Sequence, residues 1–438
     1  MLNQGENNKH LEHYRELVRV LLKVVSLLSP LILIPIVLNL TDANIYGNYF
    51  TILSLFYFFI AMDLGIANIA NGNYAHFQKN ADNSKLLYIN QSVRVLNRVF
   101  TILIIPSLSS CFFIINHLND YRWQDFEVMS LRISAVFTFA VYLAFMGNLG
   151  LKLDIAQSKT IKVALMTAAQ VLCPFILLVT GIDEVNLLHL VFFFILIPQI
   201  PTAVNLFFSW RTMFIREYNQ LTSFKFYRLT ELVRQGSLFM FLQITTVIST
   251  QIDSLLVGVV LGGVAAAELS ITWRYYAVPL QFLSLFAMPL WGMASVSKVN
   301  GRSPMIWGKL RRLVLQSVIF TSIFGLVSFF VSQLIIESWT GSSISPPLPL
   351  IICCSIWLLL SSIIVHVASV LNGWGERRIL FLVYLVSSLV NLVLSFVFTI
   401  VLDSNIGVLL GSILAQSFFF LLPSVIYLRK AMSIERYD

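Results

Sequence analysis

Long apolar runs recur along the whole chain and limit its possible folds more than any other feature. Runs such as 94–116 and 348–371 are long enough to cross the ~30 Å hydrocarbon core of a bilayer. Only 11% of the residues are charged, against about 25% in a typical soluble domain. A transmembrane β-barrel would show short segments of alternating hydrophobicity instead. The pattern therefore predicts an all-α polytopic membrane protein.

Hydropathy predicts twelve transmembrane helices in two groups of six. The predicted spans are 18–40, 46–69, 94–116, 128–149, 161–181, 187–210, 237–260, 268–293, 312–336, 348–371, 379–402 and 406–428. They divide the chain into an N-terminal six-helix bundle (1–210), a cytoplasmic amphipathic linker (211–236) and a C-terminal six-helix bundle (237–438). Because six is even, both bundles start on the same side of the membrane. This arrangement predicts two parallel repeats around a central cavity.

The distribution of charge predicts the topology. Apart from Arg122, Arg132 and Arg274, the Lys and Arg residues all fall on one side of the membrane or at the helix ends on that side. The turns on the opposite side are acidic, with Asp42 and Asp403 among their residues. By the positive-inside rule both termini are cytoplasmic. The net charge of +8 is therefore a topology signal, and no nucleic-acid partner is expected.

A few charged residues lie within the predicted spans, where a carboxylate costs roughly 2.5 kcal/mol or more. Counting residues from each hairpin turn places Asp253 and Arg274 at one depth, and Lys23 and Asp63 at another. Each couple could be an ion pair that only locks its hairpin. Alternatively, each couple could line a substrate cavity, where the cation holds an anion and the acid binds a proton. Arg132, near the end of its span, either extends to the interface or joins this cavity.

Motifs for catalysis or for metal binding are missing from the sequence. It contains no Walker A loop, GxSxG or HExxH, and its four cysteines all lie in apolar runs. We therefore expect no enzyme activity, no metal and no cofactor. His366 could relay a proton, although a packed, hydrogen-bonded histidine is the simpler interpretation.

Three segments carry a resemblance to a known family. They are DLGIANIANGNYA (63–75), IDSLLVG (252–258) and LNGWGER (371–377). With two sets of six spans, the chain resembles the Wzx-type polysaccharide flippases of the multidrug/oligosaccharidyl-lipid/polysaccharide exporter superfamily. The resemblance implies a bacterial inner-membrane protein that moves an undecaprenyl-diphosphate-linked oligosaccharide from the cytoplasmic to the periplasmic leaflet. The cargo would be a repeat unit of O-antigen, the polymer of lipopolysaccharide, or of a related surface polysaccharide.

The resemblance also implies partners. These are the lipid-linked substrate, membrane lipids, H⁺ or Na⁺ as a coupling ion, and the polymerase and chain-length regulator of the same pathway. A diphosphate needs cations in a shielded cavity, and Lys23 and Arg274 are the best placed to supply them. Polar residues of the seventh span could contact sugar hydroxyls; they are Gln243, Thr245, Thr246, Thr250 and Gln251.

Three other functions compete with this interpretation. An ion-coupled multidrug exporter of the same superfamily would share the fold and the span count. A polymerase or ligase of the pathway would need a large outer loop, whereas the outer loops here are short and acidic. A scaffold without transport activity would not need charges within its spans.

Overall fold

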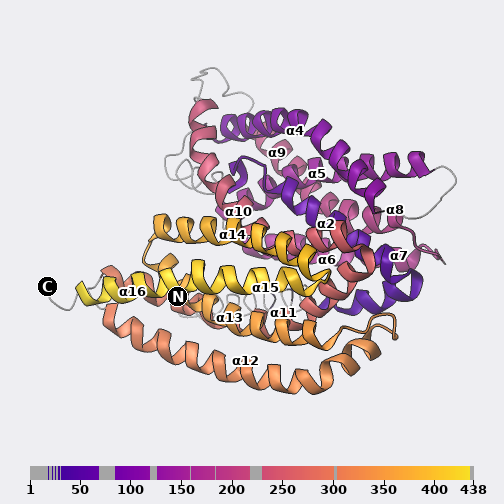
Figure 1. The fold of residues 1–438 in the computed structure, drawn as a ribbon. Helices are drawn as coiled ribbons and strands as arrows, with labels where there is room; N and C mark the ends of the chain where they lie inside the picture. The colour runs from indigo at the N-terminus through magenta and orange to yellow at the C-terminus, as the bar shows by residue number, and fades with distance from the viewer. Residues whose placement is uncertain are drawn as a thin grey trace, which may run out of the picture. The chain divides into compact units, whose positions relative to one another are not determined.

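A computed structural model gives the fold of the chain (Figure 1). It describes residues 31–68, 84–118, 126–157, 159–182, 184–217, 229–299 and 303–434, together with a few isolated positions between 18 and 29. Within these ranges the regular secondary structure is entirely helical. The predicted all-α architecture is confirmed.

Ten helices in the described part of the chain are long and apolar enough to cross a membrane. They begin with Ser92–His117 and end with Ile406–Ala431, and they match the last ten predicted spans. The two remaining predicted spans correspond to a shorter apolar helix, Leu31–Leu40, and to α2 (Ala43–Ile60). The protein is therefore a multi-pass membrane protein.

The chain divides into two compact units. Unit 1 consists of Met1–Thr41 and Leu55–Gln243, and unit 2 of Asp42–Ser54 and Ile244–Asp438. Two continuous helices, α2 and α10 (Leu229–Leu261), each contribute one part to unit 1 and one to unit 2. The first three turns of α2 thus belong to the mainly C-terminal unit.

Unit 1 contains six further labelled helices: α4 (Ser84–His117), α5 (Phe126–Ala156), α6 (Thr160–Leu172), α7 (Ile176–Val179), α8 (Leu187–Leu190) and α9 (Ile200–Glu217). Short 3₁₀ turns occur at Pro174 and Pro198, where proline removes a backbone donor and bends the helical path. The core includes Phe56 and Phe59 of α2, whose rings stand edge-on to Phe137 of α5.

Unit 2 contains α11 (Gly263–Val299), α12 (Ser303–Trp339), α13 (Leu348–Gly373), α14 (Arg377–Leu402), α15 (Ile406–Ala415) and α16 (Leu422–Ile434). A π-helical turn, Gln416–Leu421, joins the last two. Two apolar clusters form its core, one around Trp374 and Leu371 and the other around Tyr276 and Trp357.

Parts of the predicted linker 211–236 are helical. Helix α9 continues to Glu217 and α10 starts at Leu229, whereas the apolar spans end at Ser209 and begin at Phe239, close to the predicted ends. Apolar and basic residues alternate in this stretch, and a helix can carry both on different faces. Its middle part, 218–228, lies outside the described residues.

Glycines bring α14 and α15 close together. A Cβ added at Gly411 would lie 2.5 Å from the backbone nitrogen of Ser395, and one at Gly407 would lie 2.4 Å from that of Thr399. Small residues at such positions let helix backbones pack closely within a membrane. The close approach also sets the positions of polar side chains on α14, as described below.

We predict that Gly411→Ala destabilises the protein, because overpacking a tight helix contact costs about 1–3 kcal/mol. The measurement is the thermal unfolding midpoint of the purified protein. Gly308→Ala is the matched control, since a Cβ at Gly308 meets no atom within 4 Å. An unchanged midpoint for Gly411→Ala would contradict the close contact.

Candidate functional site

A buried carboxylate surrounded by oxygen atoms is the main polar feature of unit 2. Asp253 of α10 is 4% exposed. Its Oδ2 accepts a 2.6 Å hydrogen bond from Ser412 of α15, and its Oδ1 lies 3.4 Å from the hydroxyl of Ser395 on α14. The side-chain oxygen of Asn391, one turn before Ser395, lies within 3.0 Å of both hydroxyls. We call Asp253, Asn391, Ser395 and Ser412 the oxygen cluster.

The oxygen cluster contains more acceptors than protons. The Ser395 hydroxyl, which carries one proton, faces Asp253, the Asn391 side chain at 2.9 Å and the Val408 carbonyl at 3.1 Å. The Ser412 hydroxyl similarly faces two acceptors. In this orientation of the Asn391 amide, a bound proton or cation would supply the missing positive charge. The opposite orientation would point the amide NH₂ at the serines and saturate the cluster.

The donor set decides which ion the oxygen cluster fits. Hard monovalent and divalent cations prefer carboxylate, amide, hydroxyl and carbonyl oxygens, whereas transition metals prefer nitrogen and sulfur. No group of three His, Cys, Asp or Glu side chains occurs among the described residues. With one formal negative charge, the oxygen cluster fits Na⁺ or a proton.

The local sequence explains why Asp253 faces this way. Thr245, Ser249 and Asp253 are spaced by four residues and so lie on one face of α10. The Ser388 hydroxyl of α14 lies 3.0 Å from the Thr245 carbonyl and 2.9 Å from the Ser249 hydroxyl. This polar contact between α10 and α14 directs the whole face, with its carboxylate, towards α14.

The geometrically possible pair between Asp253 and Arg274 is not formed. Within the described residues, Arg274 has no carboxylate at ion-pair distance. Its guanidinium carbon lies 4.7 Å from the ring centroid of Phe50 on α2, a cation–π contact within unit 2. The rotation of α10 turns the carboxylate towards Ser395 and Ser412 instead. Arg274 is partly exposed.

Asp63 lies in the turn that follows α2 and is 1% exposed. Its Oδ1 accepts a 2.7 Å hydrogen bond from the Gly65 amide, while no hydrogen bond to Oδ2 occurs in the described part of the chain. Lys23, its predicted partner, lies outside the described residues, so that pair stays a prediction.

The other residues predicted from the sequence are not members of the oxygen cluster. Arg132 is exposed near the start of α5. Thr246 and Thr250 are exposed on α10. His366 is fully buried, and its Nε2 lies 2.8 Å from the Ser317 hydroxyl, an arrangement that fits a packed, hydrogen-bonded histidine.

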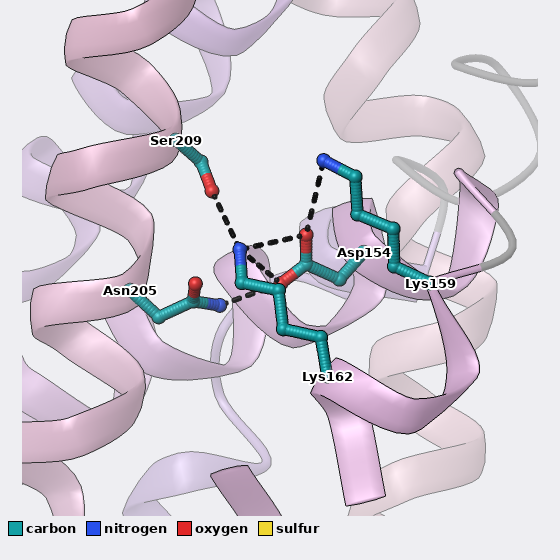
Figure 2. A network of polar contacts seen from close by, with 5 residues as sticks. All are labelled: Asp154, Lys159, Lys162, Asn205 and Ser209. Carbon is teal, nitrogen blue, oxygen red and sulfur yellow. Dashed lines mark hydrogen bonds and ion pairs between the residues drawn. The ribbon is translucent and has the colours of Figure 1, made fainter. Parts of the chain in front are cut away.

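A further buried carboxylate, which was not predicted from the sequence, is Asp154 of α5; it is 1% exposed (Figure 2). The ammonium of Lys162 lies 3.2 Å and 3.1 Å from its two oxygens, and Asn205 of α9 donates a 2.6 Å hydrogen bond to Oδ2. Acidic residues that lie among lysines near a span end are usually solvated. The position of Asp154 between Leu153 and Ile155 was the available signal of burial.

We predict that Na⁺ or a lower pH raises the thermal unfolding midpoint of the wild-type protein, and that Asp253→Asn abolishes this response. A bound cation stabilises the folded state by mass action, and the variant removes the charge that attracts it. Choline chloride at equal concentration controls for ionic strength. Asp403→Asn, at the exposed end of α14, is the matched variant and should keep the response. A wild-type midpoint that ignores both Na⁺ and pH would contradict the cation site.

Comparison with known proteins identifies the fold. No protein-family model and no curated protein sequence matches the chain. A solved structure of the lipid II flippase MurJ in an inward closed conformation has a TM-score of 0.71 at 14% identity, covering 95% of this chain and 87% of that one.

Transporters of a second kind are similar to a comparable degree. An inward-facing multidrug resistance MATE family transporter of the MOP superfamily has a TM-score of 0.72 at 11% identity, with 96% of both chains covered. A MATE structure in complex with MaL6 has a TM-score of 0.57 at 12% identity, covering 97% of this chain and 98% of that one. At these identities the similarity shows a shared fold: the chain has the fold of MurJ and the MATE transporters.

Proposed function

We propose that this protein is a cation-coupled flippase of the MOP superfamily. It would move an undecaprenyl-diphosphate-linked oligosaccharide, a repeat unit of O-antigen or a related surface polysaccharide, from the cytoplasmic to the periplasmic leaflet of a bacterial inner membrane by alternating access. The observation that carries this proposal is Arg274, a partly exposed guanidinium in a membrane-spanning helix without a carboxylate partner among the described residues.

An intramembrane guanidinium without a counter-ion is costly, so such residues are rare and mark functional sites. Arginine is suited to diphosphates because its planar donors bind two oxygens at once. The Phe50 ring, whose centroid lies 4.7 Å from the guanidinium carbon, would hold the guanidinium in place while its N–H donors bind an anion. We therefore assign to Arg274 the binding of the diphosphate headgroup.

The separation of Asp253 from Arg274 supports coupling to an ion. A direct pair would neutralise both charges. Instead, Arg274 retains a positive charge for an anionic substrate, and the oxygen cluster retains a negative charge for Na⁺ or H⁺. When bound, the cation would supply positive charge to the contact between α10, α14 and α15, and so change the stability of that contact.

Several predictions from the sequence belong to this proposal. They are cytoplasmic termini, the bundle boundaries at 210 and 237, a contribution from Lys23 and Asp63 near the cytoplasmic end, a role for Arg132, and association with the polymerase and chain-length regulator. The small number of intramembrane cations favours a weakly charged or zwitterionic glycan over a strongly acidic one. Full-rate transport of a polyuronic unit would contradict that preference.

Ion-coupled multidrug export is the second candidate, favoured by the shared fold with a MATE transporter. A site for cationic drugs needs a carboxylate that is accessible to the drug. Asp253 and Asp154 are both buried and hydrogen-bonded by their neighbours, whereas Arg274 is partly exposed. This difference favours an anionic substrate.

We predict that Arg274→Ala abolishes the surface polysaccharide and causes lipid-linked oligosaccharide to accumulate in the host bacterium. The variant loses the positive charge that would bind the diphosphate. Arg274→Lys is the matched variant; it keeps the charge but loses bidentate geometry, so we expect partial function. Gel analysis of surface glycan and extraction of lipid-linked sugars measure the outcome in a deletion strain complemented with each variant.

Two results would contradict the proposal. One is normal surface glycan in the deletion strain together with increased sensitivity to cationic dyes, which would indicate a drug exporter. The other is full complementation by Arg274→Ala at wild-type protein levels, which would remove Arg274 from substrate binding.

A further inference from the structure

The Asp154 site in unit 1 has the chemistry of a monovalent-cation site whose cation is covalently attached to the chain (Figure 2). The three N–H donors of the Lys162 ammonium face three oxygens: both carboxylate oxygens of Asp154, at 3.2 and 3.1 Å, and the hydroxyl of Ser209, at 3.3 Å. Each ammonium donor therefore has an acceptor.

Close packing in unit 1 forms this site. A Cβ at Gly147 would lie 2.2 Å from the Thr202 hydroxyl oxygen, and one at Gly150 would lie 3.0 Å from the Cβ of Leu206. The backbones of α5 and α9 therefore approach closely just before Asp154. This approach brings the carboxylate within 2.6 Å of the Asn205 amide nitrogen and buries it.

The position of Lys162 is unfavourable for the helix that carries it. Lys159 is the N-cap residue of α6, and Lys162 lies in the first turn. Cations at a helix N-terminus oppose the helix dipole, which favours anions there. The contact with Asp154 offsets this cost. The ammonium therefore stabilises the buried carboxylate of α5 and does not stabilise its own helix.

Units 1 and 2 use similar residues around a buried aspartate. In unit 1, Asn205 and Ser209 are four residues apart on α9; Asn205 donates to Asp154, and Ser209 accepts from Lys162. In unit 2, Asn391 and Ser395 are four residues apart on α14; Ser395 lies against Asp253, and Asn391 contacts Ser395. The difference is the positive charge: Lys162 supplies it in unit 1, whereas no Lys or Arg forms an ion pair with Asp253 among the described residues.

We propose that Lys162 is a tethered cation that makes the Asp154 site of unit 1 independent of dissolved ions. This part of the inference stands on the geometry of unit 1 alone. Its consequence, that the coupling cation acts only on unit 2, rests on the proposed function. Lys162 is a positioning residue: it keeps α5, α6 and α9 together through Asp154.

The experiment measures thermal unfolding of the purified full-length protein in methylammonium, ammonium or sodium chloride, with choline chloride as the control for ionic strength. All variants carry Asp253→Asn, so that the oxygen cluster does not contribute. Lys162→Ala should unfold at a lower temperature in choline and recover with rising methylammonium in a saturable way. The variant is purified in methylammonium so that its site stays filled, and the methylammonium is exchanged for the test salt before measurement.

Two matched variants distinguish a cation site from simple packing. Lys159 is 47% exposed and lies 3.9 Å from Asp154, so Lys159→Ala should gain no cation response. The neutral pair Asp154→Asn with Lys162→Met should be more stable in choline than Lys162→Ala, and should not respond to cations. If Lys162→Ala cannot be recovered, recovery of folded protein from the neutral pair provides the test.

Two results would overturn the tethered cation. The first is a Lys162→Ala protein that is destabilised and ignores every cation. The second is a neutral pair no more stable than Lys162→Ala. The proposed function is tested separately, with the protein that carries Asp253→Asn and keeps Lys162. If its unfolding midpoint still responded to cations, the coupling site would not be the oxygen cluster. Even then, comparing the cation titration of the Lys162→Ala, Asp253→Asn double variant with that of Asp253→Asn alone would decide the role of Lys162.

Discussion

The desolvation of two buried aspartates determines much of the polar structure in this membrane protein. A carboxylate at membrane depth needs hydrogen bonds or a counter-charge, because the hydrocarbon provides neither. Asp253 is surrounded by serine hydroxyls and Asp154 by an ammonium and an amide. Glycine contacts bring the helices at these sites together: Gly411 packs α15 against α14, which carry the two serines, and Gly147 packs α5 against α9, which carries Asn205. Packing and electrostatics therefore depend on each other at both sites.

The two aspartates represent different solutions to the same cost. A lysine on the chain gives a site that is always neutralised, and such a pair favours one fixed arrangement of its helices. Hydroxyls alone leave a site whose charge depends on what is dissolved around it. Only a site without a lysine can change its occupancy with the concentration of a dissolved ion. Ion coupling requires such a change. The accessible positive charge of Arg274, elsewhere in unit 2, gives a separate site to which an anionic substrate can bind.

Much of the architecture could be predicted from hydropathy, because spans are long and continuous signals. Ten of the predicted spans appear as membrane-length helices in the described part of the chain. The rotation of each helix about its axis could not be predicted from residue counts. The polar period Thr245–Ser249–Asp253 would have shown which face of α10 is buried with polar partners. Asp154 was missed because its lysine neighbours resemble a solvated turn, whereas the packing of α5 against α9 buries it.

The central claim is that cation binding at the oxygen cluster drives movement of an anionic lipid-linked substrate. The most direct measurement uses proteoliposomes that contain the purified protein and a labelled undecaprenyl-diphosphate oligosaccharide, with an imposed gradient of Na⁺ or H⁺. The label should accumulate in one leaflet only when the gradient is present, and collapsing the gradient should stop accumulation. Equal movement with and without either gradient would contradict it, as would transport of a cationic drug without movement of the lipid.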